Sequence, residues 1–256
     1  MQASDYADMY AIEESMWWFV GMRDITAALL DPICPSGTRK MILDAGCGTG
    51  ANLVWLERYS GHGRVIGLDL VADALRFCRT RGHKNLVQAS VTGIPFANET
   101  FDLVTSFDVL VQVEGEGSDE QALGEMFRVL REGGIAFVRV AAYEWMRSGH
   151  DEALGTQRRY ELGELVERME RAGFRVLRTT YANSLLLPVA VLRRLVLKRI
   201  GLADRGSDVK PLKPEFDRLN LLLAGLLRRE AHWLRNPKAR LRAGLSAICV
   251  AEKPRR

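Results

Sequence analysis

Residues 41–50 read Met-Ile-Leu-Asp-Ala-Gly-Cys-Gly-Thr-Gly, an apolar strand that runs into a glycine-dense turn. Gly46, Gly48 and Gly50 lack a Cβ, so the turn can adopt positive φ angles and a ligand can approach its backbone closely. Asp69 stands nineteen residues after Gly50, where a second apolar run ends. A carboxylate in that place can accept hydrogen bonds from both hydroxyls of a ribose, which is typical of nucleoside-binding βαβ units.

Short apolar runs alternate with amphipathic segments on both sides of this turn, which predicts βα units feeding a mostly parallel sheet. The expected strands are residues 41–44, 65–69, 86–88, 101–106, 135–141, 174–181 and 246–252. The expected helices between them are residues 52–59, 72–81, 120–131 and 162–172. Gly133-Gly134 and Gly173 stand where these patterns end, so we expect them to stop two of the helices.

Asp44 lies at the strand end, two residues before the first glycine, where a carboxylate suits a cation better than a phosphate. With it, residues 42–50 resemble the first motif of the class I S-adenosylmethionine-dependent methyltransferases, including ubiquinone-biosynthesis-like enzymes that act on small molecules. Residues 94–96 with 101–104, and residues 130–134, resemble later motifs of that family. The resemblance covers about 140 residues and implies S-adenosylmethionine as the cofactor.

The resemblance also implies the fold, an α/β Rossmann-like domain with a seven-stranded, mostly parallel sheet and helices on both faces. We expect four parts: an N-terminal helical lid (1–35), the cofactor-binding core (36–183), a helical insertion before the last strand (184–244), and the last strand with a basic tail (245–256). Carried over by position, the implied cofactor-binding residues are Asp44, Gly46, Cys47, Gly48, Gly50, Asp69, Leu70, Ser90, Val91, Phe107, Trp18 and Arg23.

Two positions depart from the family pattern. Ser90 stands where relatives often have an aspartate that contacts the adenine amino group, and a hydroxyl accepts such a bond more weakly than a carboxylate. Val111-Gln112 stands where relatives commonly show Glu-His, so the role of that histidine cannot be transferred.

The loop after the fifth strand concentrates titratable groups where an acceptor should bind. His150 is a candidate general base, oriented by Asp151 or Glu152, and Tyr160 and Tyr143 are candidates for positioning the acceptor. The alternative is structural: His150 and Asp151 cap the following turn, Arg158 and Arg159 pair with nearby acids, and both tyrosines pack.

The aromatic cluster Trp17, Trp18 and Phe19 also has two interpretations. It belongs either to a helix buried on the sheet, or to a lid that closes over the cofactor. In the lid interpretation, Tyr10 or Trp18 covers the sulfonium by a cation–π contact, and Arg23 binds the methionine carboxylate.

Charge is unevenly distributed along the 256 residues, although the formal net charge is only +4. Residues 1–183 hold 19 Lys/Arg and 26 Asp/Glu, whereas residues 184–256 hold 17 and 6. Leucine-rich helices expected at 185–200 and 215–234 carry much of the positive charge, and basic amphipathic helices can lie on anionic membrane surfaces. The alternative is a helix pair that packs its leucines on the core and solvates its arginines.

Several classes of protein are disfavoured by the same sequence. The four cysteines lack metal-ligand spacing, so we expect no metal site and no disulfide framework. The N-terminus is acidic and the longest uncharged apolar stretch is short, so we expect neither a secretion signal nor a membrane-spanning helix. The arginines alternate with leucines rather than exposed aromatics, which disfavours nucleic acid as the partner.

We therefore expect a methyltransferase that acts by O-methylation on a small-molecule or lipid-like acceptor, in secondary-metabolite or cell-envelope glycolipid biosynthesis. The basic C-terminal segment would also suit an anionic acceptor. The expected location is the cytoplasm, with peripheral contact to the inner face of the membrane. The alternatives are a catalytically silent S-adenosylmethionine-binding interaction protein and an RNA methyltransferase.

Overall fold

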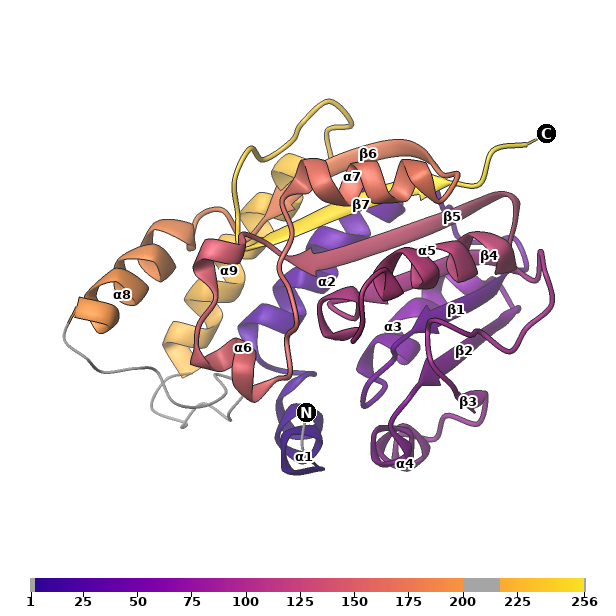
Figure 1. Ribbon diagram of the computed structural model, residues 1–256, viewed down its shortest axis with the longest axis horizontal. Coiled ribbons are helices and arrows are strands. Elements are labelled where there is room, and N and C mark those ends of the chain that lie inside the picture. The colour runs from indigo at the N-terminus through magenta and orange to yellow at the C-terminus, as the bar shows by residue number, and fades with distance from the viewer. Residues whose placement is uncertain (1–2, 200–216, 256) are drawn as a thin grey trace.

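The computed structural model describes residues 3–199 and 217–255, which contain one seven-stranded sheet flanked by helices (Figure 1). The strands are β1 (Met41–Ala45), β2 (Arg64–Asp69), β3 (Leu86–Gln88), β4 (Phe101–Phe107), β5 (Leu130–Ala141), β6 (Arg175–Ala182) and β7 (Ser246–Glu252). The α-helices are α1 (Ala3–Ile12), α2 (Trp17–Leu30), α3 (Ala51–Ser60), α4 (Ala72–Thr80), α5 (Ser118–Val129), α6 (Gly149–Ala153), α7 (Leu162–Arg171), α8 (Leu187–Arg199) and α9 (Asp217–Leu234).

The strand order is β3-β2-β1-β4-β5-β7-β6. The first five strands are parallel, and β7 enters antiparallel between β5 and β6. This arrangement confirms the expected Rossmann-like fold and brings the carboxyl ends of β1, β2, β4 and β5 to one edge of the sheet.

The predicted strands and core helices are all present, and one boundary is wrong by several residues. We expected the fifth strand to begin at residue 135, whereas β5 begins at Leu130 and runs through Gly133-Gly134. Helix α5 already ends at Val129, and Leu130 pairs with Phe101 across the sheet. The glycine pair therefore lies inside an extended segment instead of stopping the helix.

The two faces of the sheet carry separate layers of buried side chains. On one face, α5 and α7 pack through residues that include Leu123, Met126, Leu165 and Met169. On the other, α2, α3 and α9 pack through residues that include Ile25, Leu29, Leu56 and Leu227. Figure 1 shows α5 and α7 in front of the strands and α2 behind them.

Helix α2 packs as a structural helix of the core, and the lid role expected for residues 1–35 stays a prediction. Met22, Ile25 and Leu29 are buried against the sheet. Gly21 faces α9, where an added Cβ would lie 2.4 Å from the Leu227 Cβ, so its missing side chain lets the two helices approach closely. Before α2, Met9 on α1 and Glu13 in the following turn contact the glycine turn, through Gly48 and Thr49.

Helices α8 and α9 correspond to the two helices predicted in the insertion. Residues 200, 215 and 216, which the prediction included, lie outside the described residues. Helix α9 packs on α2, whereas α8 extends from the body at the left of Figure 1. Among the described residues, none of the helices has the length and hydropathy to cross a bilayer.

Candidate functional site

The glycine turn after β1 is held open by backbone geometry that favours glycine. Gly46 and Gly50 have φ angles of 90° and 93°. The backbone N–H groups of Gly46 and Cys47 donate to the carbonyl of Leu68, 2.7 and 2.9 Å away, which fixes the turn against β2. A Cβ on Gly46 would lie 2.2 Å from a methyl carbon of Val109, so a larger residue would displace the β4 connection.

The Cys47 side chain packs beneath the loop, between the glycine turn and α4. Its side chain is buried, with its Sγ 3.9 Å from the Sγ of Cys78 on α4. The Cys78 thiol in turn donates to the Gly48 carbonyl at 3.1 Å. Any contact of Cys47 with a cofactor above the loop would therefore come from its backbone.

Asp69 joins the turn to the end of β2. Its two carboxylate oxygens accept from the Gly48 and Val71 backbone N–H groups at 2.8 and 2.9 Å. Burial raises the pKa of this carboxyl group, and the backbone bonds oppose that shift. Each oxygen keeps a second lone pair that can accept a ribose hydroxyl. Leu70, directly after it, exposes its apolar side chain, as a surface that contacts an adenine would require.

Asp44 is the clearest sign that the site fits a cationic ligand. One of its oxygens accepts from the Thr105 hydroxyl at 2.7 Å, and the other, Oδ2, is buried without a partner among the described residues. Burial raises the pKa of Asp44 to about 7. A buried carboxylate oxygen without a donor is costly. S-adenosylmethionine carries an ammonium and a sulfonium, and either charge would compensate Asp44, so the residues present fit the expected cofactor.

The expected adenine side contains Ser90 and Val91, after β3. The Ser90 hydroxyl lies 2.7 Å from that of Thr92 and also accepts from the Thr92 N–H. The Val91 side chain is buried. Ser90 is thus held by its own turn, and its contact with an adenine stays a prediction.

A charged and aromatic cluster that sequence reasoning missed lies at the carboxyl end of β4. Arg139 on β5 binds Asp108 through Nε and Nη2, at 2.8 and 2.7 Å. Its guanidinium lies 4.9 Å from the Trp18 ring centre and 5.0 Å from that of Phe107. Asp108 has a φ of 59°, an uncommon conformation outside glycine that is found more often at functional sites. The signal in the sequence was an arginine inside the otherwise apolar run 135–141.

Trp18, expected to cover the cofactor, is therefore engaged with a protein cation. Phe107, another expected cofactor residue, contacts the same arginine and packs 5.6 Å from the ring of Phe137. Both residues stay candidates because they border the carboxyl ends of β4 and β5.

Arg81 fastens the end of α1 to the glycine turn, and sequence reasoning missed it too. From the end of α4 it forms ion pairs with Glu13 and Glu14 and donates through Nη2 to the Tyr10 carbonyl at 2.9 Å. Its Nε donates to the carbonyl of Thr49 in the glycine turn, and the Thr49 hydroxyl donates to Glu13. One buried guanidinium thus ties the end of α1 to the cofactor loop.

Arg23 also holds the turn between α1 and α2. Its guanidinium donates to the carbonyls of Glu13 and Glu14, at 2.9 and 3.3 Å. Tyr10 lies with its ring centre 4.2 Å from the Arg81 guanidinium. The predicted contacts of Arg23 with the methionine carboxylate and of Tyr10 with the sulfonium stay predictions, and both residues already have protein partners.

The expected catalytic role of Tyr160 is wrong, because this side chain is fully buried. Its hydroxyl donates to Asp119 at 2.8 Å, and Arg158 and Arg168 also bind that carboxylate, at 3.1 and 3.0 Å. Tyr160 is therefore a core residue that anchors the loop after β5.

Tyr143 is more accessible and occupies an unusual backbone conformation, with a φ of 63°. Its ring stacks on Tyr181 at 5.2 Å and lies 5.6 Å from Trp145. It stays a candidate for acceptor positioning.

The side chain of His150 lies outside the described residues. Its neighbour Asp151 accepts from the Ser148 N–H and binds Arg159, both at 2.8 Å. Burial opposes ionisation of Asp151, but the charge and hydrogen bond of Arg159 together with the Ser148 hydrogen bonds outweigh it, and the pKa of Asp151 is lowered. Asp151 and Arg159 thus follow the structural alternative, since this carboxylate is committed to the loop.

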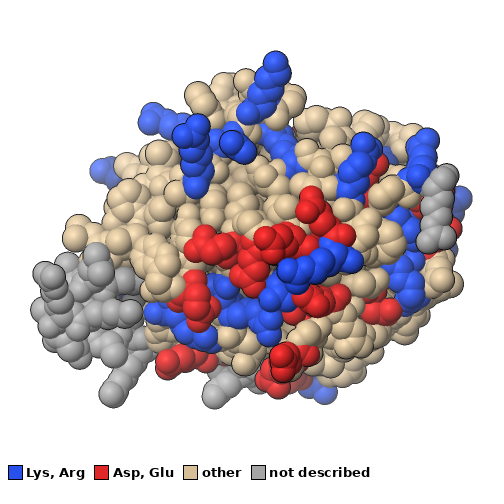
Figure 2. Space-filling view, turned by 45° about the horizontal axis from the view of Figure 1, so that its top comes forward, with Lys and Arg blue, Asp and Glu red and all other residues tan. Residues whose placement is uncertain are grey.

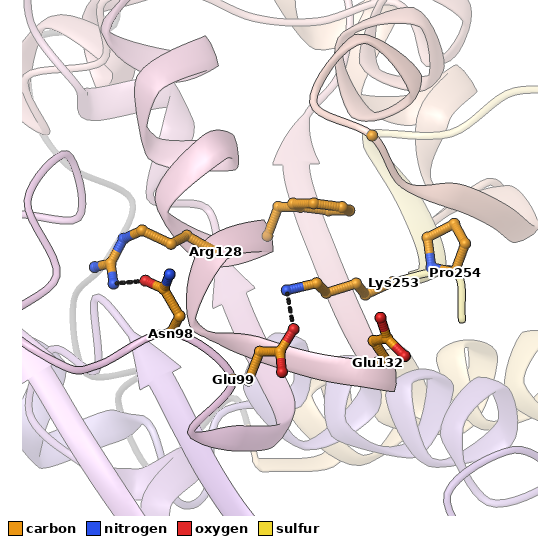
Figure 3. Close-up of a pocket in the computed structure, with 8 residues that line it drawn as sticks. Asn98, Glu99, Arg128, Glu132, Lys253 and Pro254 are labelled. Atoms are coloured by element: carbon orange, nitrogen blue, oxygen red, sulfur yellow. Dashed lines mark hydrogen bonds and ion pairs between the residues drawn. The ribbon is translucent and has the colours of Figure 1, made fainter. Parts of the chain in front are cut away.

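A pocket of about 490 Å³ lies at the opposite edge of the sheet (Figure 3). Glu99 precedes β4, Glu132 lies early in β5, and Lys253 follows β7. Lys253 binds Glu99 at 3.4 Å across it, and Arg128 donates to Asn98 at 2.9 Å. Because it sits at the amino ends of β4 and β5, this pocket is remote from the cofactor residues.

Comparisons with known proteins agree with the motifs. Residues 43–138 match the family model described as "Methyltransferase domain". A fatty-acid O-methyltransferase of Mycolicibacterium smegmatis is 32% identical over 45% of this chain and 44% of its own. An Arabidopsis thaliana tRNA (carboxymethyluridine(34)-5-O)-methyltransferase is 33% identical over 46% of this chain and 27% of its own. The chain thus spans less than half the length of these relatives.

The fold is shared more widely. A Haloferax volcanii protein solved in complex with the Trm112 methyltransferase activator superposes with a TM-score of 0.62 at 19% identity, covering 99% of this chain and 96% of that one. Solved S-adenosylmethionine-dependent methyltransferases show the same architecture.

Proposed function

Because residues 43–138 form a class I S-adenosylmethionine-dependent methyltransferase domain, we propose that this protein transfers a methyl group to an oxygen of a lipid-like acceptor, and specifically to a carboxylate. The single observation that carries cofactor binding is the buried, unpartnered Oδ2 of Asp44 beside the glycine turn. Asp69 and the backbone of Gly46 and Gly48 complete the surface that would hold the cofactor.

When bound, S-adenosylmethionine supplies an electrophilic methyl group on a sulfonium. Displacement at that carbon depends mainly on positioning and on the exclusion of water. Asp44 and Asp69 orient the cofactor from two strand ends. Arg81 holds α1 and its following turn over the loop, and the Asp108–Arg139 pair fixes the β4 connection beside it.

A carboxylate acceptor is supported by the candidate acids and bases whose side chains the structure describes, since these are already engaged; the side chain of His150 is not among them. Tyr160 is buried, Asp151 is bound to Arg159, and Asp108 is bound to Arg139. An alcohol needs a base to become nucleophilic, whereas a carboxylic acid is already ionised at neutral pH. The partial similarity to a fatty-acid O-methyltransferase supports the same acceptor chemistry.

The test is formation of S-adenosylhomocysteine by the purified protein with fatty acids of increasing chain length. We expect turnover with the free acids and none with the corresponding alcohols, and loss of turnover in Asp69→Ala. Cofactor binding without turnover on any acceptor would favour the silent binding protein instead. Methylation of tRNA with no methylation of fatty acids would favour the RNA enzyme and contradict the proposal.

A further inference from the structure

Exposed apolar side chains are concentrated on α8 and α9. Among the described residues, seven of the eleven large hydrophobic residues that are exposed fall between residues 185 and 233. They are Leu185, Val189, Leu192, Leu219, Leu221, Leu222 and Trp233. Contiguous exposed apolar surface of this kind marks interaction sites in soluble proteins.

Helix α9 has two distinct faces. Ala224, Leu227, Ala231 and Leu234 are buried against α2 and the sheet. Leu221, Leu222, Arg228, Arg229 and Trp233 recur at helical spacing on the opposite side and are all exposed. We call these five residues the outer face of α9. Leu221, Leu222 and Trp233 are 68%, 60% and 62% exposed, so the described fold leaves the apolar side chains of the outer face open to solvent. Arg228, at its border with α2, pairs with the exposed Asp24 at 3.2 Å.

The outer face is firmly held in place. Asn220 accepts from the Trp17 N–H at 2.7 Å and donates to the Ser15 carbonyl at 3.0 Å, which ties α9 to the start of α2. Glu230, buried on the inner side, accepts from the Asn183 and Leu185 N–H groups at 2.8 and 2.7 Å. These bonds fix the rotation of α9, so the leucines and arginines point outward together.

The charge beside this apolar surface is predominantly positive. Residues 217–242 carry seven Lys/Arg and two Asp/Glu, and one of those acids is the buried Glu230. Arg235, Lys238, Arg240 and Arg242 are exposed in the loop after α9. In Figure 2, Lys and Arg side chains gather along the upper left without acids among them, whereas the two signs are mixed in the centre.

We propose that the outer face of α9, with the exposed side chains of α8, binds the surface of an anionic lipid bilayer. Leucine and tryptophan side chains enter the interface, and the arginines bind lipid phosphates. Charge complementarity selects this occupant, because a basic helix with leucine and tryptophan on its exposed side has both terms of interfacial binding.

The position of α8 and α9 relative to the cofactor residues agrees with a lipid-like acceptor, and this step rests on the proposed function. In Figure 1, α8 and the start of α9 lie on the side toward which β5 points, the side of the cofactor residues. Asn220 contacts the turn between α1 and α2, near the Trp18–Arg139 cluster. A bilayer on this face would lie on the side of the sheet where the cofactor residues are.

The experiment is flotation of the full chain with vesicles of phosphatidylcholine, with and without one-quarter phosphatidylglycerol. We expect the wild type to float only with the anionic vesicles. Both L221Q/L222Q and R228Q/R229Q should lower the bound-to-free ratio about tenfold, because each removes one of the two binding terms. The matched controls, V54Q on α3 and R171Q/R175Q on α7 and β6, change exposed residues elsewhere and should float like the wild type.

Circular dichroism melts and cofactor titration verify that the variants fold. The proposal is wrong if the wild type stays unbound, or if both α9 variants float as it does. It is also wrong if these variants abolish self-association or RNA binding while the wild type ignores vesicles, because the surface is then a protein or RNA contact. Flotation requires no turnover, so its failure leaves the proposed methyl transfer standing.

Discussion

The junction between α1 and the glycine turn uses arginine in one way, and the outer face of α9 uses it in the opposite way. The Arg81 side chain is 8% exposed and contacts Glu13, Glu14, Tyr10 and Thr49. The Arg228 side chain is 59% exposed and pairs with Asp24 at 3.2 Å. The first arginine is fixed by its surroundings, and the second can exchange its partner for another anion.

This difference predicts the kind of ligand that each region can recognise. Buried charges need specific partners, so the Asp44 and Asp69 region can select one small molecule. Exposed pairs contribute little individually, and a surface built from them gains affinity only by adding many contacts. An extended anionic surface fits the second region for that reason.

The largest expected effect is on stability, and it comes from substitution on the inner side of α9. Comparing this side with the outer face tests whether the two faces of the helix differ as described. Leu227→Ala removes a fully buried side chain between α2 and the sheet, and should lower the free energy of unfolding by about 3 kcal/mol. Leu222→Ala, five residues earlier on the outer face, should change it by less than about 0.5 kcal/mol. Urea denaturation followed by circular dichroism measures both. Equal losses would show that the outer face is packed in solution, which would contradict the division of α9.

The next effect concerns the cofactor region. Asp69→Ala should weaken S-adenosylmethionine binding at least about tenfold, roughly 1.4 kcal/mol. It removes the ribose acceptor and also frees the Gly48 N–H that shapes the turn. Calorimetric titration measures the affinity, with Asp73→Ala on the exposed side of α4 as the matched control. If both variants bind alike, Asp69 does not contact the cofactor.

The cofactor region was also the part most predictable from sequence. Strand, glycine turn, helix and acid are all local, and β3 and β7 occur at the residues expected. Local spacing is enough there because each element follows the previous one directly along the chain.

The contacts between distant segments could not be predicted. Arg81 meets Glu13 across 68 residues, and Arg139 meets Trp18 only because β5 and α2 approach in space. Tyr160 was misjudged for the same reason: its partner Asp119 lies on α5, and only the fold shows that the phenol points inward. The sequence showed which residues have reactive or charged side chains, but it did not show where those side chains point in the folded protein.

The smallest effect is a pH dependence that links the buried charge to its ligand. Burial raises the pKa of Asp44 from 3.8 to about 7. Without cofactor, this group therefore adds stability that is fully present below about pH 4 and is lost as the pH rises through about 7. A cationic cofactor binds the ionised form, so its affinity should rise about fivefold between about pH 6 and 7 and then level off.

Asp44→Asn tests whether that carboxylate is the cause, because the amide keeps the shape and cannot titrate. The variant should bind the cofactor more weakly and lose the rise in affinity over the same pH range. Its stability without cofactor should also fall less than that of the wild type as the pH rises, since no buried charge forms. A wild-type affinity that is flat across this range would mean that Asp44 is already ionised and paired before the cofactor arrives. The cofactor region and the outer face of α9 would then differ less, because the charged groups of both regions would already have partners before a ligand binds.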